Sequence, residues 1–254
     1  MANSTAYHSH YPCNEGSGVP ADVAGVTSMD VGDLISNVWT NSGWVTTAGN
    51  QTSVPTSKNA GGLIIEPQPD FDLVQGDSLL MMFWVKMSSP TSGSEKIIGT
   101  IARNAEAGFN ITSGGGSSDQ TQLSIFSSES NSPQQVLSGR WLDGKVHHIA
   151  VAIDGATKFG QWFIDGVPAK DVDESGSLQN VVDLGGSTKN SNDEFYGYGI
   201  SGDGSGNEES FEGQFRDIHT LVFNNSGLPH NVQEIVGWAM SNPHQTLPVS
   251  VVGV

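Results

Sequence analysis

The residues best suited to chemistry in this sequence are two adjacent histidines, His147 and His148, and an aspartate that follows them, Asp165. A histidine oriented by an aspartate is the general base of a serine hydrolase triad. Such a triad also needs a serine on a Gly-x-Ser-x-Gly turn that leads from a strand into a helix. The chain has too little helical pattern to supply that turn, so we expect the histidines to serve the fold and not a reaction.

The apolar alternation around these histidines predicts the strand that holds them. Side chains of a strand alternate between its faces, so His147 shares a face with Ile149, and His148 shares the other face with Ala150. The first face is the better core face, and the small residues of the second are expected where another layer lies close. Asp165 and Gly166 then form a two-residue hairpin loop, whose positions favour positive φ. Turn geometry therefore explains Asp165 better than catalysis does.

Elsewhere the sequence predicts strands separated by Gly-, Ser- and Asn-rich turns. One helical pattern occurs, over residues 228–240, with Asn231 at the N-cap position. Nine or more strands at this spacing predict two packed antiparallel sheets. The predicted strands are residues 61–67, 78–87, 95–103, 108–112, 121–128, 145–154, 158–165, 166–172 and 213–224.

Composition and charge exclude several classes of partner. The chain has 254 residues, 32 of them glycine, and its net charge is −17, from 27 acidic and 10 basic residues. That field repels nucleic acid and anionic membrane surfaces. The longest strongly apolar run, residues 79–85, is far shorter than the ~20 residues that cross a bilayer. Cys13 is a single cysteine, which excludes an internal disulfide, and the N-terminus lacks the pattern of a signal peptide.

The stretch GRWLDGKVHHIAVAIDGATKFGQWFIDGVPA, residues 139–169, resembles the central motif of laminin-G-like domains of the concanavalin A-like lectin/glucanase superfamily. Residues 11–25, 78–87 and 211–238 resemble three further motifs of that family, in the same order. The resemblance implies an all-β, two-sheet antiparallel β-sandwich jelly roll with one short C-terminal helix. One histidine of the pair would pack within the sandwich and the other would face a loop.

The predicted domain organisation is a laminin-G-like jelly roll over residues 11–243 with two short ends. Residues 1–10 form an N-terminal arm, and residues 244–254 form an apolar C-terminal tail that is either an extra strand or a segment for docking on a neighbouring chain. His8 and His10 could bind a transition metal, but a frayed polar terminus is the simpler interpretation.

Retaining glucanases of this superfamily carry two glutamates and an aspartate on one face of a strand, because their chemistry needs two carboxyls about 5 Å apart. The nearest match here is KDVDES, residues 170–175, in which Asp171 and Asp173 share a face while the first glutamate is absent and Glu174 points the other way. We therefore expect no enzyme activity. An atypical glycosidase with an inverting pair assembled from distant loops stays an alternative.

The resemblance also implies Ca²⁺ in loops at the rim, where carboxylates and carbonyls supply oxygen ligands. The candidate metal ligands are Asn14, Glu15 and Asp22 in the opening motif and Asp203, Ser205 and Asn207 in the acidic loop 190–210. A solvated surface loop is the simpler alternative for the second group. The candidate sugar-binding aromatics are Phe195, Tyr196, Tyr198 and Trp39, whereas Trp84, Trp141 and Trp162 are expected in the core or on a sheet face.

We expect a non-catalytic structural or attachment protein, specifically a virion component such as a bacteriophage capsid decoration or tail-fibre protein. A solitary lectin-like domain with one cysteine and an acidic surface fits a protein made in a bacterial cytoplasm and then exposed in a virion. Its partners would be other protein subunits, in a homo-oligomer or a virion lattice, and surface glycans, without nucleic acid or membrane insertion. The alternative is a free-standing carbohydrate-binding lectin, Ca²⁺-dependent or not, that is extracellular by a non-classical route.

Overall fold

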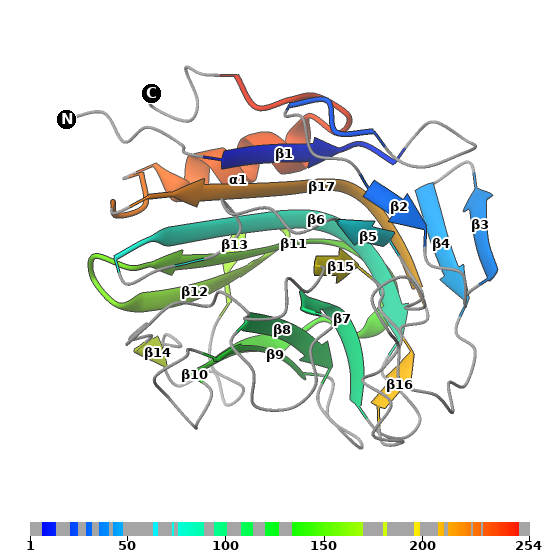
Figure 1. Ribbon diagram of the computed structural model, residues 1–254, viewed down its shortest axis with the longest axis horizontal. Coiled ribbons are helices and arrows are strands. Elements are labelled where there is room, and N and C mark those ends of the chain that lie inside the picture. Colours follow the sequence, from blue (N-terminus) through cyan, green and yellow to red (C-terminus); the bar gives the residue numbers. More distant parts are fainter. Residues whose placement is uncertain are drawn as a thin grey trace.

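The computed structural model shows a mostly β-stranded molecule with a helix near its C-terminal end (Figure 1). No described helix is long and apolar enough to span a membrane. The structure describes residues 7–13, 21–24, 29–31, 36–40, 43–47, 63–65, 73, 76–88, 94–100, 108–113, 120–126, 134–169, 180–181, 196–198, 208–210, 213–224, 226–229 and 231–248.

The first of two sheets, sheet A, has strand order β13-β12-β11-β6-β17-β4-β3, with β1 paired to β17 and β14 paired to β12. All of its pairings are antiparallel. Its strands are β1 (Tyr7–Tyr11), β3 (Ser36–Thr40), β4 (Gly43–Thr47), β6 (Ser78–Ser88), β11 (Asp143–Asp154), β12 (Phe159–Ile164), β13 (Val167–Pro168), β14 (Asn180–Val181) and β17 (Gly213–Phe223).

The second sheet, sheet B, has strand order β10-β9-β8-β7-β15-β5-β2, with β16 paired to β7 in the parallel direction. Its other pairings are antiparallel. Its strands are β2 (Met29–Val31), β5 (Leu63–Ile65), β7 (Ser94–Thr100), β8 (Gly108–Ser113), β9 (Gln120–Phe126), β10 (Gln134–Arg140), β15 (Tyr196–Tyr198) and β16 (Glu208–Ser210).

The core lies between the sheets, because alternate residues of the long central strands point to one face. Phe83 on β6, Val151 on β11 and Phe215 on β17 are buried there against Ile97 and Ile111 of sheet B. Each such side chain contributes about 1.5–3 kcal/mol to the free energy of folding by leaving water. The predicted fold class, an all-β two-sheet antiparallel β-sandwich with a short C-terminal helix, is confirmed.

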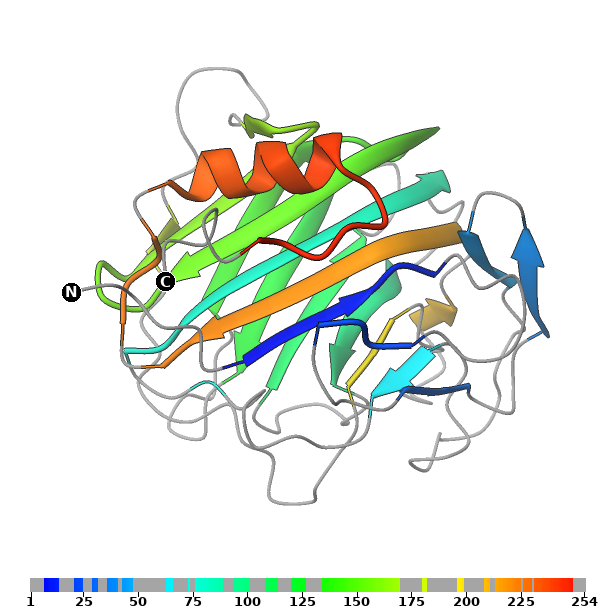
Figure 2. The ribbon, with the colours of Figure 1, turned by 90° about the horizontal axis from the view of Figure 1, so that it is seen from above.

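The outer face of sheet A, opposite the core, is covered over one part by helix α1 (Val232–Ser241) and by residues 244–248 (Figure 2). Ile235 and Val236 of the helix and Leu247 of the following segment pack on Ala150 and Ala152. The small residues predicted on that face of the 145–154 strand therefore lie under a further layer, as expected.

The hairpin between β12 and β13 forms at the predicted Asp165 and Gly166, which have φ of 50° and 77°. Of the two histidines before it, His147 faces the hairpin loop at Asp165, as expected, whereas the other does not pack within the sandwich. His148 lies on the outer face of sheet A beside Trp84, not between the sheets. His147, on the core-side face, lies at the rim near Trp141, where the sandwich ends.

The residues assigned to an N-terminal arm are partly in the sheet, because β1 pairs with β17 from Tyr7–Val222 to Tyr11–Ile218. The simpler interpretation of His8 and His10, a frayed polar terminus, was wrong. His10 is fully buried, because the pairing carries it under the C-terminal segment.

Candidate functional site

The outer face of sheet A is covered and apolar along one part of its strands and uncovered along the next part. On β6 the outward residues Leu80 and Met82 lie in the covered apolar cluster, whereas the next two outward residues, Trp84 and Lys86, lie beyond it. Val146, at the same level on β11, is 48% exposed. We call this uncovered part the open end of sheet A.

Three strands that are far apart in the sequence build the open end. On β6, Trp84 pairs with His148 of β11 on one side and with Arg216 of β17 on the other. One level further, Lys86 pairs with Val146 and with Gln214 in the same way. Paired residues of antiparallel strands share a face, so these side chains form a two-row grid.

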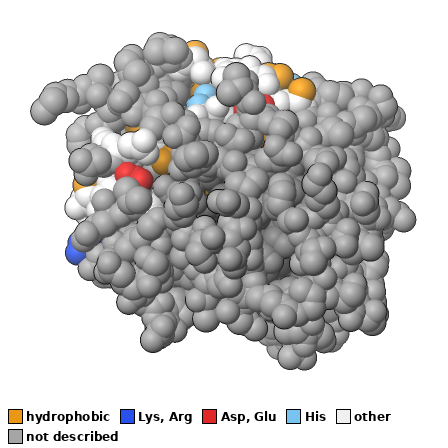
Figure 3. Space-filling model, viewed as in Figure 1, with side chains coloured by type: hydrophobic (Ala, Val, Ile, Leu, Met, Phe, Trp, Pro, Cys, Tyr) orange, Lys and Arg blue, Asp and Glu red, His pale blue; other side chains and the backbone are white. Residues whose placement is uncertain are grey.

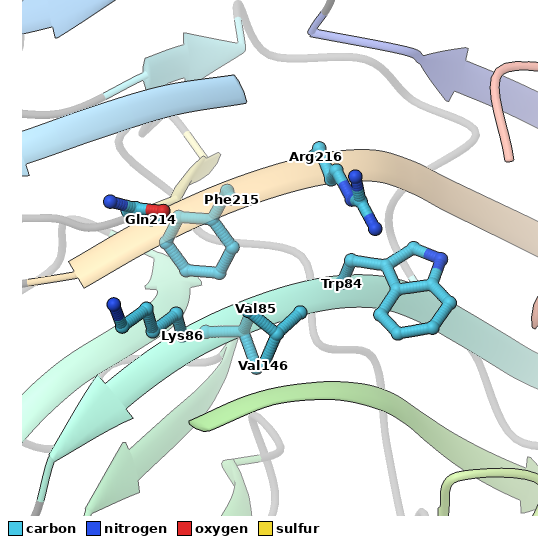
Figure 4. Close-up of a pocket in the computed structure, with 7 residues that line it drawn as sticks. All are labelled: Trp84, Val85, Lys86, Val146, Gln214, Phe215 and Arg216. Atoms are coloured by element: carbon cyan, nitrogen blue, oxygen red, sulfur yellow. The ribbon is translucent and has the colours of Figure 1, made fainter. Parts of the chain in front are cut away.

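A hollow with a cavity volume of about 60 Å³ lies in this grid (Figure 4). It has room for roughly four water molecules at about 15 Å³ each, so it accepts one functional group and not a whole sugar ring. The residues that line it are Trp84, Val85, Lys86, Val146, Gln214, Phe215 and Arg216.

The hollow presents hydrogen-bond donors. The guanidinium carbon of Arg216 lies 5.0 Å from the centre of the Trp84 ring, a cation–π contact that orients the guanidinium. Nε1 of Trp84 and Nε of Arg216 are buried and have no hydrogen-bond partner within the described part of the chain. Because those two atoms are buried, the donors that a ligand can reach are the other N–H groups of the basic and amide side chains that line the hollow.

His148 adds no positive charge to this end at neutral pH. Its ring lies edge-to-face with Trp84 at 5.2 Å between centroids. Burial lowers the pKa of His148 to about 4, against a smaller opposing effect of Asp165 and Asp217. The imidazole is therefore neutral at pH 7, and the charge of the open end comes from Arg216 and Lys86.

His147 belongs to a separate cluster at the rim. Its Nδ1 lies 2.8 Å from Oδ2 of Asp165 and its Nε2 lies 3.0 Å from Oδ1 of Asp143. Partial burial lowers the pKa of His147, but hydrogen bonds to the two carboxylates outweigh it, so the pKa lies above its ordinary value. Asp165 also accepts the backbone N–H of His148 at 2.9 Å and thereby fastens the hairpin to β11.

A third cluster, the histidine stack, lies under the C-terminal segment. The rings of His10 and His219 stack at 3.8 Å between centroids, and the rings of His8 and His219 are nearly parallel at 5.9 Å. Figure 3 shows histidine side chains near the top of the molecule, the side that carries α1 in Figure 1. Burial lowers the pKa of His8 to about 4 and that of His219 well below its ordinary value.

A β-bulge supplies the carboxylate of this cluster. Because Arg216 pairs with Trp84 and His219 pairs with Met82, two residues of β17 lie opposite one of β6. Asp217 is one of the two, has φ of 48° and is buried. Its Oδ1 accepts the backbone N–H of His244, while Oγ1 of Thr246 lies 3.4 Å from Nδ1 of His10. These contacts hold residues 244–248 on the sheet.

Stacked rings point their nitrogen atoms sideways and not toward a shared point. Accordingly, within the described ranges no group of three or more His, Cys, Asp or Glu side chains is placed to hold a metal ion. Of the predicted calcium ligands, Asp22 is described, and its Oδ1 accepts the backbone N–H groups of His10 at 2.9 Å and Ala24 at 3.0 Å. The other predicted ligands, Asn14, Glu15, Asp203, Ser205 and Asn207, lie outside the described residues.

The predicted sugar-binding aromatics are not brought to the open end as a group. Tyr196 and Tyr198 lie in β15, between β5 and β7 of sheet B. Trp39 lies in β3 at the edge of sheet A, paired with Trp44, and Phe195 lies outside the described residues. Sequence reasoning missed Arg216 and Lys86. The signal that could have found them was the even spacing from Trp84 to Lys86 and from Gln214 to Arg216.

Residues 57–220 match the family described as the concanavalin A-like lectin/glucanases superfamily. No curated protein matches the sequence.

Several solved structures share the fold at low sequence identity. The sialidase of Trypanosoma rangeli is 16% identical with a TM-score of 0.58, over 92% of this chain and 32% of that one. Botulinum neurotoxin type C, in a study of cell entry that depends on two ganglioside molecules, is 11% identical with a TM-score of 0.55, over 92% and 50%. The binding domain of botulinum neurotoxin DC, in complex with rat synaptotagmin II, is 10% identical with a TM-score of 0.56, over 92% and 50%. The chain thus spans between a third and a half of these proteins.

Proposed function

Because the chain belongs to the concanavalin A-like lectin/glucanase superfamily, we propose that it is a non-catalytic attachment module that recognises its target through the open end of sheet A. The observation that carries this proposal is the composition of the hollow. An aromatic ring, an amide and two basic side chains line it, together with apolar residues, and none of the lining residues that the structure describes is a carboxylate. Glycoside hydrolysis needs a pair of carboxyls, whereas binding needs only oriented donors and an apolar surface.

Glycans are the ligand class that the fold favours. The type C neurotoxin structure concerns cell entry that depends on interaction with two ganglioside molecules, and the DC structure is a complex with rat synaptotagmin II. Fold likeness alone does not assign a ligand, since one fold hosts many functions. The partly exposed Trp84 beside the exposed Val146 supplies the local argument, because an aromatic ring next to hydrogen-bond donors suits a sugar ring with its hydroxyl groups.

The setting that we propose for this attachment is the surface of a virion, with the chain as a decoration or fibre subunit. The net charge of −17 supports an exposed, soluble subunit that avoids nucleic acid. Sedimentation of native material tests the setting. We expect the chain in particle fractions of a density gradient, and its recovery only as a free small species contradicts the setting without touching the binding proposal.

A glycan array tests the binding itself. We expect the wild-type chain to bind a defined set of glycans, and we expect Trp84→Ala to weaken that binding at least tenfold. Val167→Ala is the matched control, because Val167 is an exposed apolar residue outside the hollow. A second arm with a chelator separates direct recognition at the open end, which survives, from recognition through bound Ca²⁺, which is lost.

Two outcomes count against the proposal. Binding that Trp84→Ala leaves unchanged, in a variant whose thermal unfolding shows it to be folded, removes the open end as the contact site. Hydrolysis of any polysaccharide in a broad panel contradicts a non-catalytic module. If that hydrolysis disappears in the Asp171→Asn, Asp173→Asn double variant, the atypical glycosidase is the better description.

A further inference from the structure

Two basic residues at the open end, Arg216 and Lys86, have no anionic partner among the described residues. Within the described part of the chain, no salt bridge joins Arg216 or Lys86 to a carboxylate. Lys145 shows the contrast, since its Nζ lies 2.6 Å from Oδ2 of Asp143. Arg216 is only partly exposed, and its guanidinium contacts the Trp84 ring.

This lack of partners is unexpected in so acidic a chain. The sequence carries 27 acidic residues and 10 basic ones, so a typical cation has many carboxylates to choose from. Two of those 10 basic residues line the same hollow, on the paired strands β6 and β17. A partly buried guanidinium without an anion loses favourable hydration, and no ion pair offsets that cost. An anion bound from outside the chain would offset that desolvation cost.

We infer that the hollow is a subsite for the acid group of a carbohydrate, a carboxylate or a sulfate, with Arg216 as its anchor. The inference rests on the proposed attachment function and adds the charge of the ligand to it. The guanidinium forms a planar fork that matches the oxygens of a carboxylate or a sulfate, and its contact with Trp84 holds it beside the hollow. Lys86, across the strand pair, adds a second positive charge.

The size of the site and the net charge narrow the ligand class. A cavity of about 60 Å³ admits one acid group, so the sugar ring that carries it would lie outside, against Trp84 and the exposed Val146. A polyanion such as nucleic acid would bring many charges against a chain of net charge −17. A glycan with one acid group meets the local cations with far less of that repulsion.

The test uses an array in which each acid-bearing glycan stands beside its neutral parent. Sialylated and uronic-acid glycans form the carboxylate arm, and sulfated glycans form the sulfate arm, so the array also tells which acid is preferred. We expect the wild-type chain to prefer the acid-bearing member of the pairs it binds by tenfold or more. Salt should weaken binding to the acid-bearing glycans and leave the neutral ones almost unchanged.

Two charge-neutralising variants carry the inference further. Arg216→Gln should lose the acid preference, with about tenfold to a hundredfold weaker binding, which is typical of a lost hydrogen bond to a charged group. Lys86→Gln should lose a smaller part of it. Lys145→Gln is the matched control, because it removes the same charge from the chain outside the hollow and should change binding less than twofold.

The outcomes separate this inference from the attachment function. If Trp84→Ala abolishes glycan binding while acid-bearing and neutral glycans bind alike, the attachment function stands and the acid subsite is overturned. If an acid preference survives both Arg216→Gln and Lys86→Gln, the anchor lies elsewhere and the inference is also overturned. If no glycan binds at all, the attachment function and the subsite fail together.

Discussion

Asp165 shows how much one side chain does in this fold. It adopts a positive φ at the hairpin, accepts the backbone N–H of His148 and contacts the imidazole of His147. Asparagine tolerates positive φ and has a side-chain acceptor oxygen. Alanine disfavours positive φ and has no side-chain acceptor. The combination of His147, His148 and Asp165, which suggests a catalytic pair in the sequence, thus links the hairpin turn to the neighbouring strand by hydrogen bonds.

Asp165→Ala should therefore lower the free energy of unfolding by about 1–3 kcal/mol, and Asp165→Asn by less than half of that. Urea unfolding of both variants against wild type measures the difference. Equal destabilisation by the two substitutions would show that charge, and not the acceptor and the turn conformation, is what matters at this position.

Buried imidazoles make stability depend on pH. The pKa values of His8 and His148 are lowered by burial to about 4 in the folded chain, against 6.5 in the unfolded chain. Between those values the unfolded state binds the protons, so the free energy of unfolding falls as pH falls from 6.5 toward 4, by up to about 3 kcal/mol per histidine. His147 acts in the opposite sense, since its pKa is raised, but it is a single group.

Thermal unfolding at a series of pH values between 7.5 and 4 measures this effect, and we expect the melting temperature to fall across the range. His148→Gln should flatten the curve, because it removes one of the depressed groups. A melting temperature that rises on acidification would show that the buried histidines are already protonated in the fold.

At the scale of elements, two glycines show opposite requirements. A Cβ on Gly155, in the turn after β11, would lie 2.1 Å from the carbonyl oxygen of Asp77. A Cβ on Gly237, within α1, would meet nothing within 4 Å. The first glycine permits two backbone segments to approach, whereas the second only weakens its helix.

The same substitution at both positions is a matched pair. Gly155→Ala should destabilise the chain by more than about 2 kcal/mol, since the backbone must move, and Gly237→Ala should stabilise it by about 0.5–1 kcal/mol. Denaturant unfolding of the two variants decides the matter. A neutral Gly155→Ala would mean that the turn after β11 moves freely away from Asp77.

Strong alternation made the central strands predictable, and β5, β7, β8 and β9 also overlap predicted strands, whereas β1 to β4 were not predicted. β6, β11, β12 and β17 lie within one or two residues of their predicted bounds. β1, with the sequence YHSHY, carries histidines where a buried strand face would have apolar residues. His10 is nevertheless buried, because residues from the far end of the chain cover it. No local pattern contains that information.

The candidate site was hidden for a related reason. Trp84, Val146 and Arg216 become neighbours only through the register of three strands, and one of those strands carries the bulge at Asp217. A sequence predicts that each residue points outward, but it does not predict which outward residues stand side by side. The site prediction therefore favoured loops, where short-range composition is visible.

At the scale of the whole molecule, β1 and the segment after α1 pack against each other on sheet A. β1 pairs with β17, and the segment after α1 lies over sheet A, where Thr246 contacts His10 and Leu247 enters the apolar cluster beneath the helix (Figure 2). Leu247 is 5% exposed, so it is part of this second core and not a mobile tail.

Leu247→Ala should lower the free energy of unfolding by about 2–3 kcal/mol, as expected for a leucine removed from a packed site. Gln245→Ala, an exposed neighbour in the same segment, should change it by less than about 0.5 kcal/mol. Equal, small effects in guanidinium unfolding would show that the segment is not packed on the sheet in solution.

The pairing of β1 with β17 also has a consequence for synthesis. β1 leaves the ribosome before its partner β17 and before the segment that covers its histidines, which follow more than 200 residues later. Contacts so distant in sequence form slowly, and here they cannot form until residues 7–246 have all emerged. During translation β1 must therefore stay unpaired and exposed to solvent. A ribosome that stalls before β17 would leave β1 free to bind chaperones or a neighbouring copy of the chain.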